Sequence, residues 1–180
     1  AVAVDNALNY QSLETSQQQL ARERDRLRLL LEVNNAVVSR LELRDVFAAT
    51  TACLRRVLPN DYTSLALYEP DGNLFRLYAL DFPVSKGLLQ EGMVNRVDGT
   101  PAGLALRSGT PHVFTETDLQ AFQTDFVKLL LAEGIKSVCC VPLRSHDLVL
   151  GTLNTASLRP GAFAEDDVQL LTQVANQIAI

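Results

Sequence analysis

The most reactive side chains of the 180-residue sequence are three cysteines, Cys53 and the adjacent pair Cys139 and Cys140. The pair lies in a β-rich segment, where neighbouring side chains point to opposite faces of a sheet. We therefore predict two small, buried, apolar side chains rather than a disulfide or a reactive thiolate. A redox or nitric-oxide sensor is the alternative. So few cysteines form no disulfide framework, which favours a reducing cytoplasm.

Metal and catalytic signals are weak in this sequence. His112 and His146 are well separated, and neither has a Cys or His nearby at the spacing of zinc ligands. We find no Gly-rich phosphate loop and no nucleophile elbow. We therefore expect no metal site, no catalytic residue and no enzymatic activity, and the sequence does not identify a cofactor.

The irregular segment from Phe82 to Phe114 is the best candidate for a loop that covers a ligand, because long loops in compact domains are often functional. It carries basic side chains that could bind an anion. The candidates are Lys86, Arg96, Arg107 and His112. The alternative is that each is a solvated loop residue.

Small and polar residues in two predicted central strands leave room for a ligand or water. Ser64 lies on one face of its strand, and Thr152 and Asn154 share one face of theirs. The alternative for Asn154 is a hydrogen bond to neighbouring backbone. Gly151 points to the other face, where we expect it to let a terminal helix pack closely.

These residues must be positioned by both helices and strands. Hydrophobic periodicity and turn residues predict helices at about 43–58, 101–108, 126–133 and from 165 onward, and strands at about 62–68, 74–82, 112–114, 136–144 and 148–157. Adjacent hairpins favour an α+β fold with a mainly antiparallel sheet. We expect the terminal helices to cover one face and the irregular middle segment to cover the other.

A further helix is predicted over residues 12–40, which contain no Gly or Pro. Its heptad pattern is polar early and apolar late, which favours parallel pairing with a second copy. A helix packed on its own domain is the alternative. The predicted dimer positions are Leu13, Leu20, Leu27, Leu31 and Val38.

Composition excludes several classes of function. The net charge of −5 argues against direct nucleic-acid contact, which needs clustered basic residues. No apolar run approaches the roughly 20 residues of a membrane span, and the N-terminus does not resemble a signal peptide. We expect a cytoplasmic protein without membrane contact, cut from a longer chain.

Several motifs resemble those of GAF domains. The match is densest in the segment Ser137-Val138-Cys139-Cys140-Val141-Pro142-Leu143, in Leu150-Gly151-Thr152-Leu153-Asn154, and in Phe163, Asp167 and Ala175-Asn176-Gln177-Ile178-Ala179. Three earlier segments resemble the sensor region of formate-hydrogenlyase-activator-type sigma-54-dependent regulators. They are residues 30–37, 68–70 and 129–137.

The resemblance implies a central antiparallel sheet of about five or six strands, with a ligand pocket on one face and terminal helices on the other. It covers residues 29–180, which we expect to form a GAF sensor domain, and the heptad pattern predicts a linker helix at 1–28, partly coiled-coil. The implied function is small-molecule sensing for a bacterial transcriptional regulator, as a homodimer. A ligand-free interaction module, a sensor-kinase domain and a GAF-related methionine-sulfoxide reductase are alternatives. Cyclic-nucleotide binding is disfavoured, because Thr155 and Val168 stand where such domains carry Lys and Glu.

Overall fold

The computed structural model describes residues 17, 20, 24, 43–146 and 148–179. The chain divides into two compact units, residues 1–43 and 44–180. In the first unit, the described positions 17, 20 and 24 are helical, and the Leu20 side chain is 68% exposed. The other predicted dimer positions, Leu13, Leu27, Leu31 and Val38, lie outside the described residues, so the heptad stays a prediction.

The second unit is built on a six-stranded sheet with the order β3-β2-β1-β6-β5-β4, in which every neighbouring pair is antiparallel. This confirms the predicted fold class. The strands are β1 (Tyr62–Glu69), β2 (Leu74–Asp81), β3 (Val94–Arg96), β4 (His112–Thr115), β5 (Ser137–Ser145) and β6 (Leu148–Ser157). A 3-10 turn, η1 (Pro70–Gly72), joins β1 to β2.

The three central strands pair so that side chains opposite one another share a face. Asn154 of β6 lies opposite Ser64 of β1 and Cys140 of β5. Ala156 lies opposite Tyr62 and Val138 in the same way. Since side chains alternate along a strand, these residues form two adjacent rows on one face of the sheet, and the residues between them point to the other face.

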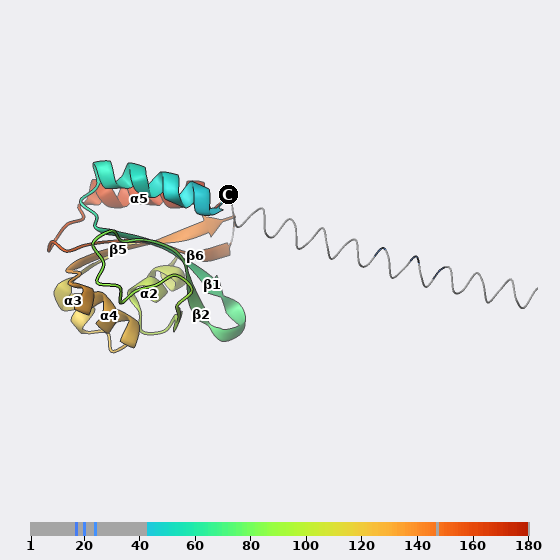
Figure 1. Cartoon of the computed structure of the whole chain (residues 1–180), viewed down its shortest axis with the longest axis horizontal. Coiled ribbons are helices and arrows are strands. Elements are labelled where there is room, and N and C mark those ends of the chain that lie inside the picture. The colour runs from blue at the N-terminus through green and yellow to red at the C-terminus, as the bar shows by residue number, and fades with distance from the viewer. Residues whose placement is uncertain (1–16, 18–19, 21–23, 25–42, 147, 180) are drawn as a thin grey trace, which may run out of the picture. The chain divides into compact units, whose positions relative to one another are not determined.

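That other face is covered by two helices, residues 43–57 and α5 (Glu165–Ile178), which lie side by side (Figure 1). Both are amphipathic. The first buries Phe47 and Leu54, and α5 buries Leu171 and Ala175 against the sheet. The α5 N-terminus is acidic, and the Asp167 carboxylate accepts the Ala164 backbone N–H at 2.8 Å, which satisfies a free donor of the first turn.

The first face of the sheet is covered by α2 (Pro101–Ser108), α3 (Glu116–Gln120) and α4 (Asp125–Glu133), together with the segment that leads into α2 (Figure 1). Pro101 begins α2, Thr100 caps it by accepting the Gly103 N–H, and Gly109 ends it at a φ of 65°. The core on this face includes Leu119, Val127, Leu130 and Ile135.

The helices and strands predicted from residue 43 onward were confirmed, and the structure adds two elements. One explanation, for Gly151, was wrong. β3 and α3 were not predicted. The reason given for Gly151 was wrong: a Cβ there would lie 2.1 Å from the Ala66 carbonyl oxygen, so the glycine is required by the neighbouring strand and not by a helix. The pairing of β1 with β2 is irregular between Leu65 and Ala66, beside this close approach.

Candidate ligand-binding site

A small cavity lies between the sheet and helices α2 and α4, with a volume of about 30 Å³. The central strands provide its floor, α2 and α4 its walls. It is lined by Tyr62, Asn95, Thr100, Pro101, Ala102, Phe126, Leu130, Val138, Cys140, Asn154 and Ala156. The lining is therefore largely apolar with a few polar groups, which is the usual character of a small-molecule site.

The polar groups of the floor form a short hydrogen-bonded row. Ser64 Oγ accepts the Tyr62 hydroxyl at 2.8 Å and the Asn154 Nδ2 amide at 3.3 Å. Asn154 is 8% exposed, and its Oδ1 has no hydrogen-bond partner among the described residues. Buried polar atoms are nearly always hydrogen-bonded, so this acceptor marks the floor as a place for a further donor.

The ionisable groups on the floor stay neutral. Burial raises the pKa of the Tyr62 phenol, against a smaller lowering by its hydrogen bond to Ser64. Burial also raises the pKa of the Cys140 thiol well above its ordinary value. Both groups therefore remain protonated at neutral pH, and the cavity floor carries no charge.

The predicted site residues divide between this cavity and other places. Asn154 lines the cavity, and Ser64 supports it from the next strand. Thr152 is fully buried on the same face of β6, opposite Ala66, but outside the lining. Its Oγ1 has no hydrogen-bond partner within the described ranges of the chain.

Arg96 lies outside the cavity, at the end of β3. Its exposed side chain lines a shallow surface depression together with Gln123, Asp125 and Leu129. The depression and the cavity share Asn95 and Phe126 as lining residues. The depression is therefore the outer neighbour of the cavity, and Arg96 belongs to its rim.

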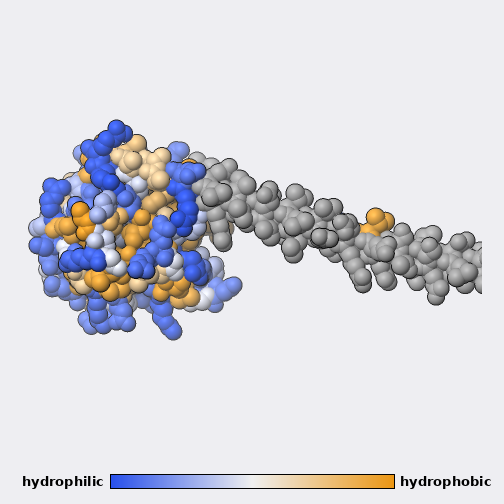
Figure 2. All heavy atoms as spheres, in the orientation of Figure 1, coloured by the Kyte–Doolittle hydropathy of each residue, from blue (hydrophilic) through white to orange (hydrophobic). Residues whose placement is uncertain are grey.

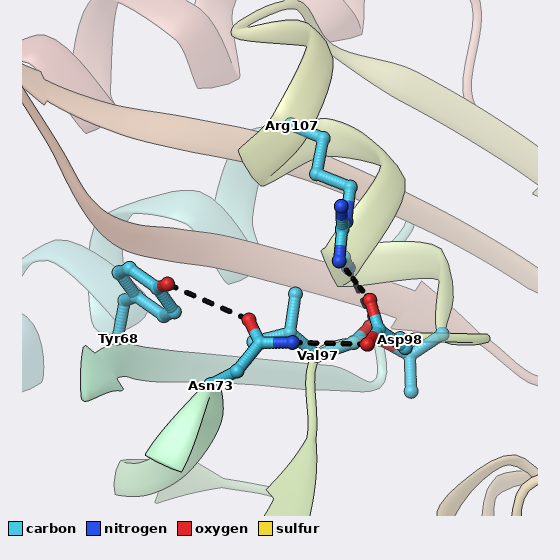
Figure 3. A network of polar contacts seen from close by, with 7 residues as sticks. Tyr68, Asn73, Val97, Asp98 and Arg107 are labelled. Carbon is cyan, nitrogen blue, oxygen red and sulfur yellow. Dashed lines mark hydrogen bonds and ion pairs between the residues drawn. The ribbon is translucent and has the colours of Figure 1, made fainter. Parts of the chain in front are cut away.

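Arg107 belongs to a polar network at the β1–β2 turn (Figure 3). Its guanidinium pairs with the Asp98 carboxylate, which also accepts Asn73 Nδ2 at 3.0 Å. Asn73 adopts the left-handed conformation, with a φ of 50°, and its carbonyl accepts the Val97 N–H at 3.1 Å. The network therefore ties α2 to the hairpin and leaves Arg107 outside the cavity lining.

His112 also lies away from the cavity, at the start of β4. Its Nε2 is 2.9 Å from Ser108 Oγ at the end of α2, and its ring stacks on Phe114 with 6.0 Å between centroids. These contacts join β4 to α2. They give His112 a structural partner on each side, and His112 does not line the cavity.

A buried carboxylate holds the loop over residues 83–92 against α4. Glu133, 3% exposed, accepts the Ser85 hydroxyl at 2.9 Å and the backbone N–H groups of Lys86 and Leu88 at 2.6 and 2.7 Å. Burial alone would raise the pKa of Glu133, but the hydrogen bonds outweigh it and the pKa is lowered. Glu133 therefore stays ionised in its partly enclosed position.

The same loop is connected to the cavity through Phe82, the residue before it, and through Leu89 within it. Phe82 packs edge-on against Tyr62 with 5.5 Å between ring centroids, and Leu89 is buried in the same core. The interpretation of residues 82–114 as a loop that covers a ligand stays a prediction. The role of Glu133 was not foreseen, since an acidic residue at a helix end usually indicates solvent exposure.

Cys139 and Cys140 point to opposite faces, as predicted from their adjacency. Both are buried and free, whereas Cys53 is exposed. Burial raises the pKa of the Cys139 thiol to about 12, with a smaller contribution from the Asp167 carboxylate of α5. Cys140 is part of the cavity lining, which sequence reasoning missed because the register of β5 against β6 was unknown.

A second concave surface lies on the opposite side of the sheet, between the two covering helices. It is an open, mainly apolar groove lined by Val46, Ala49, Thr50, Cys53, Leu170, Gln173, Val174, Gln177 and Ile178. The Val46 side chain is 47% exposed and Val57, near it in the sequence, is 66% exposed. On the face seen in Figure 2, in contrast, apolar residues are interspersed with hydrophilic ones.

Comparison with known proteins assigns the family. The chain matches the GAF domain family over residues 42–180, and it belongs to that family. The expected domain start at residue 29 falls outside the described residues and stays a prediction.

Its curated relatives are transcriptional activators. The chain is 25% identical over 164 residues to the formate hydrogenlyase transcriptional activator FhlA of Escherichia coli K12, covering 89% of this chain and 24% of that protein. It is 29% identical over 176 residues to the DNA-binding transcriptional activator HyfR of the same organism, covering 96% and 26%. The chain thus spans about a quarter of the length of these relatives.

Solved structures share the fold. The GAF domain region of a putative membrane protein from Geobacter sulfurreducens matches with a TM-score of 0.64 at 23% identity, covering 81% of this chain and 95% of that one. The GAF domain of a sensor histidine kinase from Bacillus halodurans gives 0.64 at 20%, covering 75% and 89%. A free methionine-R-sulfoxide reductase from Thermoplasma acidophilum gives 0.60 at 16%, covering 78% and 92%.

The described residues were also compared with the requirements of a metal site and of a membrane span. Within them, no three or more His, Cys, Asp or Glu side chains are grouped so as to hold a metal ion. None of the helices in that part of the chain is long and apolar enough to cross a membrane.

Proposed function

We propose that this GAF domain is a regulatory sensor that binds a small molecule in the cavity between the sheet and helices α2 and α4. The observation that carries the proposal is the buried Asn154 Oδ1 on the floor of an apolar cavity, an acceptor that has no partner in the part of the chain that the structure describes. A ligand that supplies the missing donor gains a hydrogen bond that the protein alone does not make.

The signal would leave through the sheet. The strands that form the cavity floor carry the helix over 43–57 and α5 on their other face, so a shift of β5 or β6 changes the support of both helices. For the ligand to act as a signal, it must bind two arrangements of these helices with different affinity.

The output would be transcriptional control in a cytoplasmic bacterial regulator. FhlA and HyfR are named as transcriptional activators, and this chain matches about a quarter of each. We propose that it serves as the sensor of a sigma-54-dependent activator, with no nucleic-acid contact of its own. A sensor kinase is the alternative output, favoured by the structural match to a histidine kinase domain.

We also propose that the domain acts as a homodimer through the groove between the two covering helices. The groove is mainly apolar and includes the half-exposed Val46 and the exposed Cys53. If the groove alone carried function, the domain would be a ligand-free interaction module.

A regulatory role is favoured over reductase chemistry. The shared fold at 16% identity with the sulfoxide reductase does not transfer its activity. The cysteine in the cavity, Cys140, is held as a neutral thiol by burial, whereas a catalytic cysteine needs thiolate character. Cys53 is exposed but lies on the helical face, outside the cavity lining.

A thermal-shift screen of small metabolites tests the sensor function. A ligand at about 100 times its dissociation constant adds roughly 2.7 kcal/mol to the free energy of unfolding. Ala102→Leu, which fills the cavity from α2, should abolish the shift, while Ala132→Leu at an exposed position of α4 should retain it. A ligand that stabilises Ala102→Leu as strongly as the parent would contradict binding in this cavity.

A further inference from the structure

The chemistry of the cavity restricts the kind of molecule that it can hold. Among the residues that the structure describes, no Lys, Arg, His, Asp or Glu lines the cavity. Its polar groups are a phenol, a hydroxyl, a thiol and two carboxamides, from Tyr62, Thr100, Cys140, Asn95 and Asn154. Nothing in this lining would balance a charge on the ligand.

The basic side chains near the cavity make contacts elsewhere or are exposed to solvent. Arg107 is paired with Asp98, and Lys86 Nζ donates to the Ala132 carbonyl at 2.6 Å. Arg96 lies on the exposed rim of the outer depression. An anion on the cavity floor would therefore be desolvated beside the Asn154 acceptor without a cation in the lining, which is strongly unfavourable.

The hydrogen-bonding capacity of the floor indicates what the ligand must supply. Thr100 Oγ1 is satisfied, since it donates to Val97 O at 2.8 Å and accepts the Gly103 N–H at 3.0 Å. Asn154 uses Nδ2 to donate to Ser64, and none of the described residues donates to its Oδ1. The floor therefore requires a donor, and the apolar residues Phe126, Leu130 and Val138 surround the rest of the space.

Size sets a second limit. A water molecule needs about 10–15 Å³ of such space, so the cavity of about 30 Å³ accepts a molecule of only a few heavy atoms. Even the most efficient small ligands are limited in affinity per atom, so a four-atom ligand binds with a Kd of at best roughly tens of micromolar.

We infer that the cavity takes a small uncharged molecule that donates a hydrogen bond to Asn154 Oδ1 and places a short apolar group against α4. A primary amide or a short alcohol has this chemistry. The inference rests on the proposed sensor function and excludes the anionic ligand that the basic residues of the sequence first indicated.

Four probes of equal heavy-atom count separate the alternatives: acetamide, acetone, acetate and acetamidinium. Acetamide is neutral and donates, acetone is neutral and only accepts, and the other two carry charge. Each is titrated into the 15N-labelled chain at constant ionic strength, and the amide shifts of Ala102, Asn154 and Ala156 are followed. We expect saturable shifts with acetamide and at least tenfold weaker binding of the other three.

Variants locate the interaction. Asn154→Leu should weaken the binding of acetamide at least tenfold. If the spectrum of the free variant shows that leucine disturbs the fold, Asn154→Ala provides a second test. Arg96→Ala is the matched control and should leave acetamide binding unchanged.

The outcomes distinguish this inference from the sensor function. Tighter binding of acetate than of acetamide, with the shifts of Asn154 and Ala156 retained in Arg96→Ala, would overturn the neutral-ligand inference while the cavity remained a binding site. Equal binding of acetone would overturn the role of Asn154 Oδ1. An absence of saturable shifts with all four probes would count against both the inference and the proposed cavity function.

Discussion

The carboxylate of Glu133 accepts a hydrogen bond of 2.6 Å from the backbone N–H of Lys86, which lies 47 positions earlier in the chain. This contact, with those from Ser85 and Leu88, holds the 83–92 loop on the helix whose other residues, Phe126 and Leu130, line the cavity. The loop and the cavity are thus supported by the same helix.

Glu133→Gln should destabilise the domain by about 1–3 kcal/mol, because a neutral amide accepts less strongly and cannot satisfy all three donors. Urea unfolding followed by circular dichroism measures the loss. Asp125→Asn is the matched control on the same helix, since its side chain is 97% exposed, and should cost less than about 0.5 kcal/mol. Equal losses of unfolding free energy in both variants would contradict the role of Glu133 in holding the loop.

The stability of the domain should fall in acid partly through Glu133. Its folded pKa is lowered, so its contribution is complete above the unfolded pKa and is lost as the pH falls through the folded value, below about pH 5. Asp118, whose pKa is lowered by hydrogen bonds from Thr115, acts in the same direction. Denaturant midpoints from pH 7 to 3 should therefore decline less in Glu133→Gln than in the parent chain. Parallel declines would show that Glu133 titrates normally.

Gly151→Ala should destabilise the sheet by about 1–3 kcal/mol, although alanine is ordinarily tolerated better than glycine inside a strand. The added Cβ would lie 2.1 Å from the Ala66 carbonyl oxygen, and backbone cannot move as a side chain can. Gly72→Ala is the comparison, since its Cβ would meet only the flexible Leu74 side chain. Thermal unfolding of both variants checks the difference, and a neutral Gly151→Ala would contradict the close approach.

Thiol labelling should separate the cysteines into two classes. Cys53 is exposed and should react with a chromogenic disulfide in the folded chain. Cys139 and Cys140 are buried, and their pKa values are raised, so they should react only at the rate of unfolding. Mass spectrometry of timed samples identifies the modified positions. Rapid modification of Cys140 in folded protein would support the redox-sensor hypothesis.

Val46→Asp should weaken self-association if the groove between the two helices is the dimer surface. Val46 is 47% exposed, so the charge costs little in a single chain but would be buried in a dimer. Leu104→Asp on α2 is matched in exposure, at 44%, and lies on the opposite face. Sedimentation velocity over a concentration series compares them. If both variants dissociated equally, or if neither dissociated, this groove would be excluded as the dimer surface.

Much of the fold could be predicted from local patterns. Turn residues on either side of 148–157 and the 3.6-residue period in 43–57 predict elements whose bounds differ little from those observed. β3 was missed because three residues are too few for alternation to be recognised. α3 was missed because its capping residue, Thr115, also ends a strand.

The site was only partly predictable, for a physical reason. Alternation places Ser64 on one face of β1 and Asn154 on one face of β6, but it cannot bring the two together, since this depends on a register formed across 90 positions. The basic residues were predicted to bind an anion from their charge alone. Their partners, such as Asp98 for Arg107, are chosen by the tertiary path of the chain.

The central strands have one further consequence, which concerns how such a domain can diverge. In β1, β5 and β6 the cavity-facing positions named above, 62, 64, 138, 140, 154 and 156, are all even-numbered. The numbers of each paired couple add to an even sum, so residues that lie opposite one another on one face have the same parity. The odd-numbered residues between them face the helices. Substitutions can therefore alter chemical specificity on one side of the sheet while the surface that carries the helices keeps its composition, so the two properties can evolve along separate sets of positions.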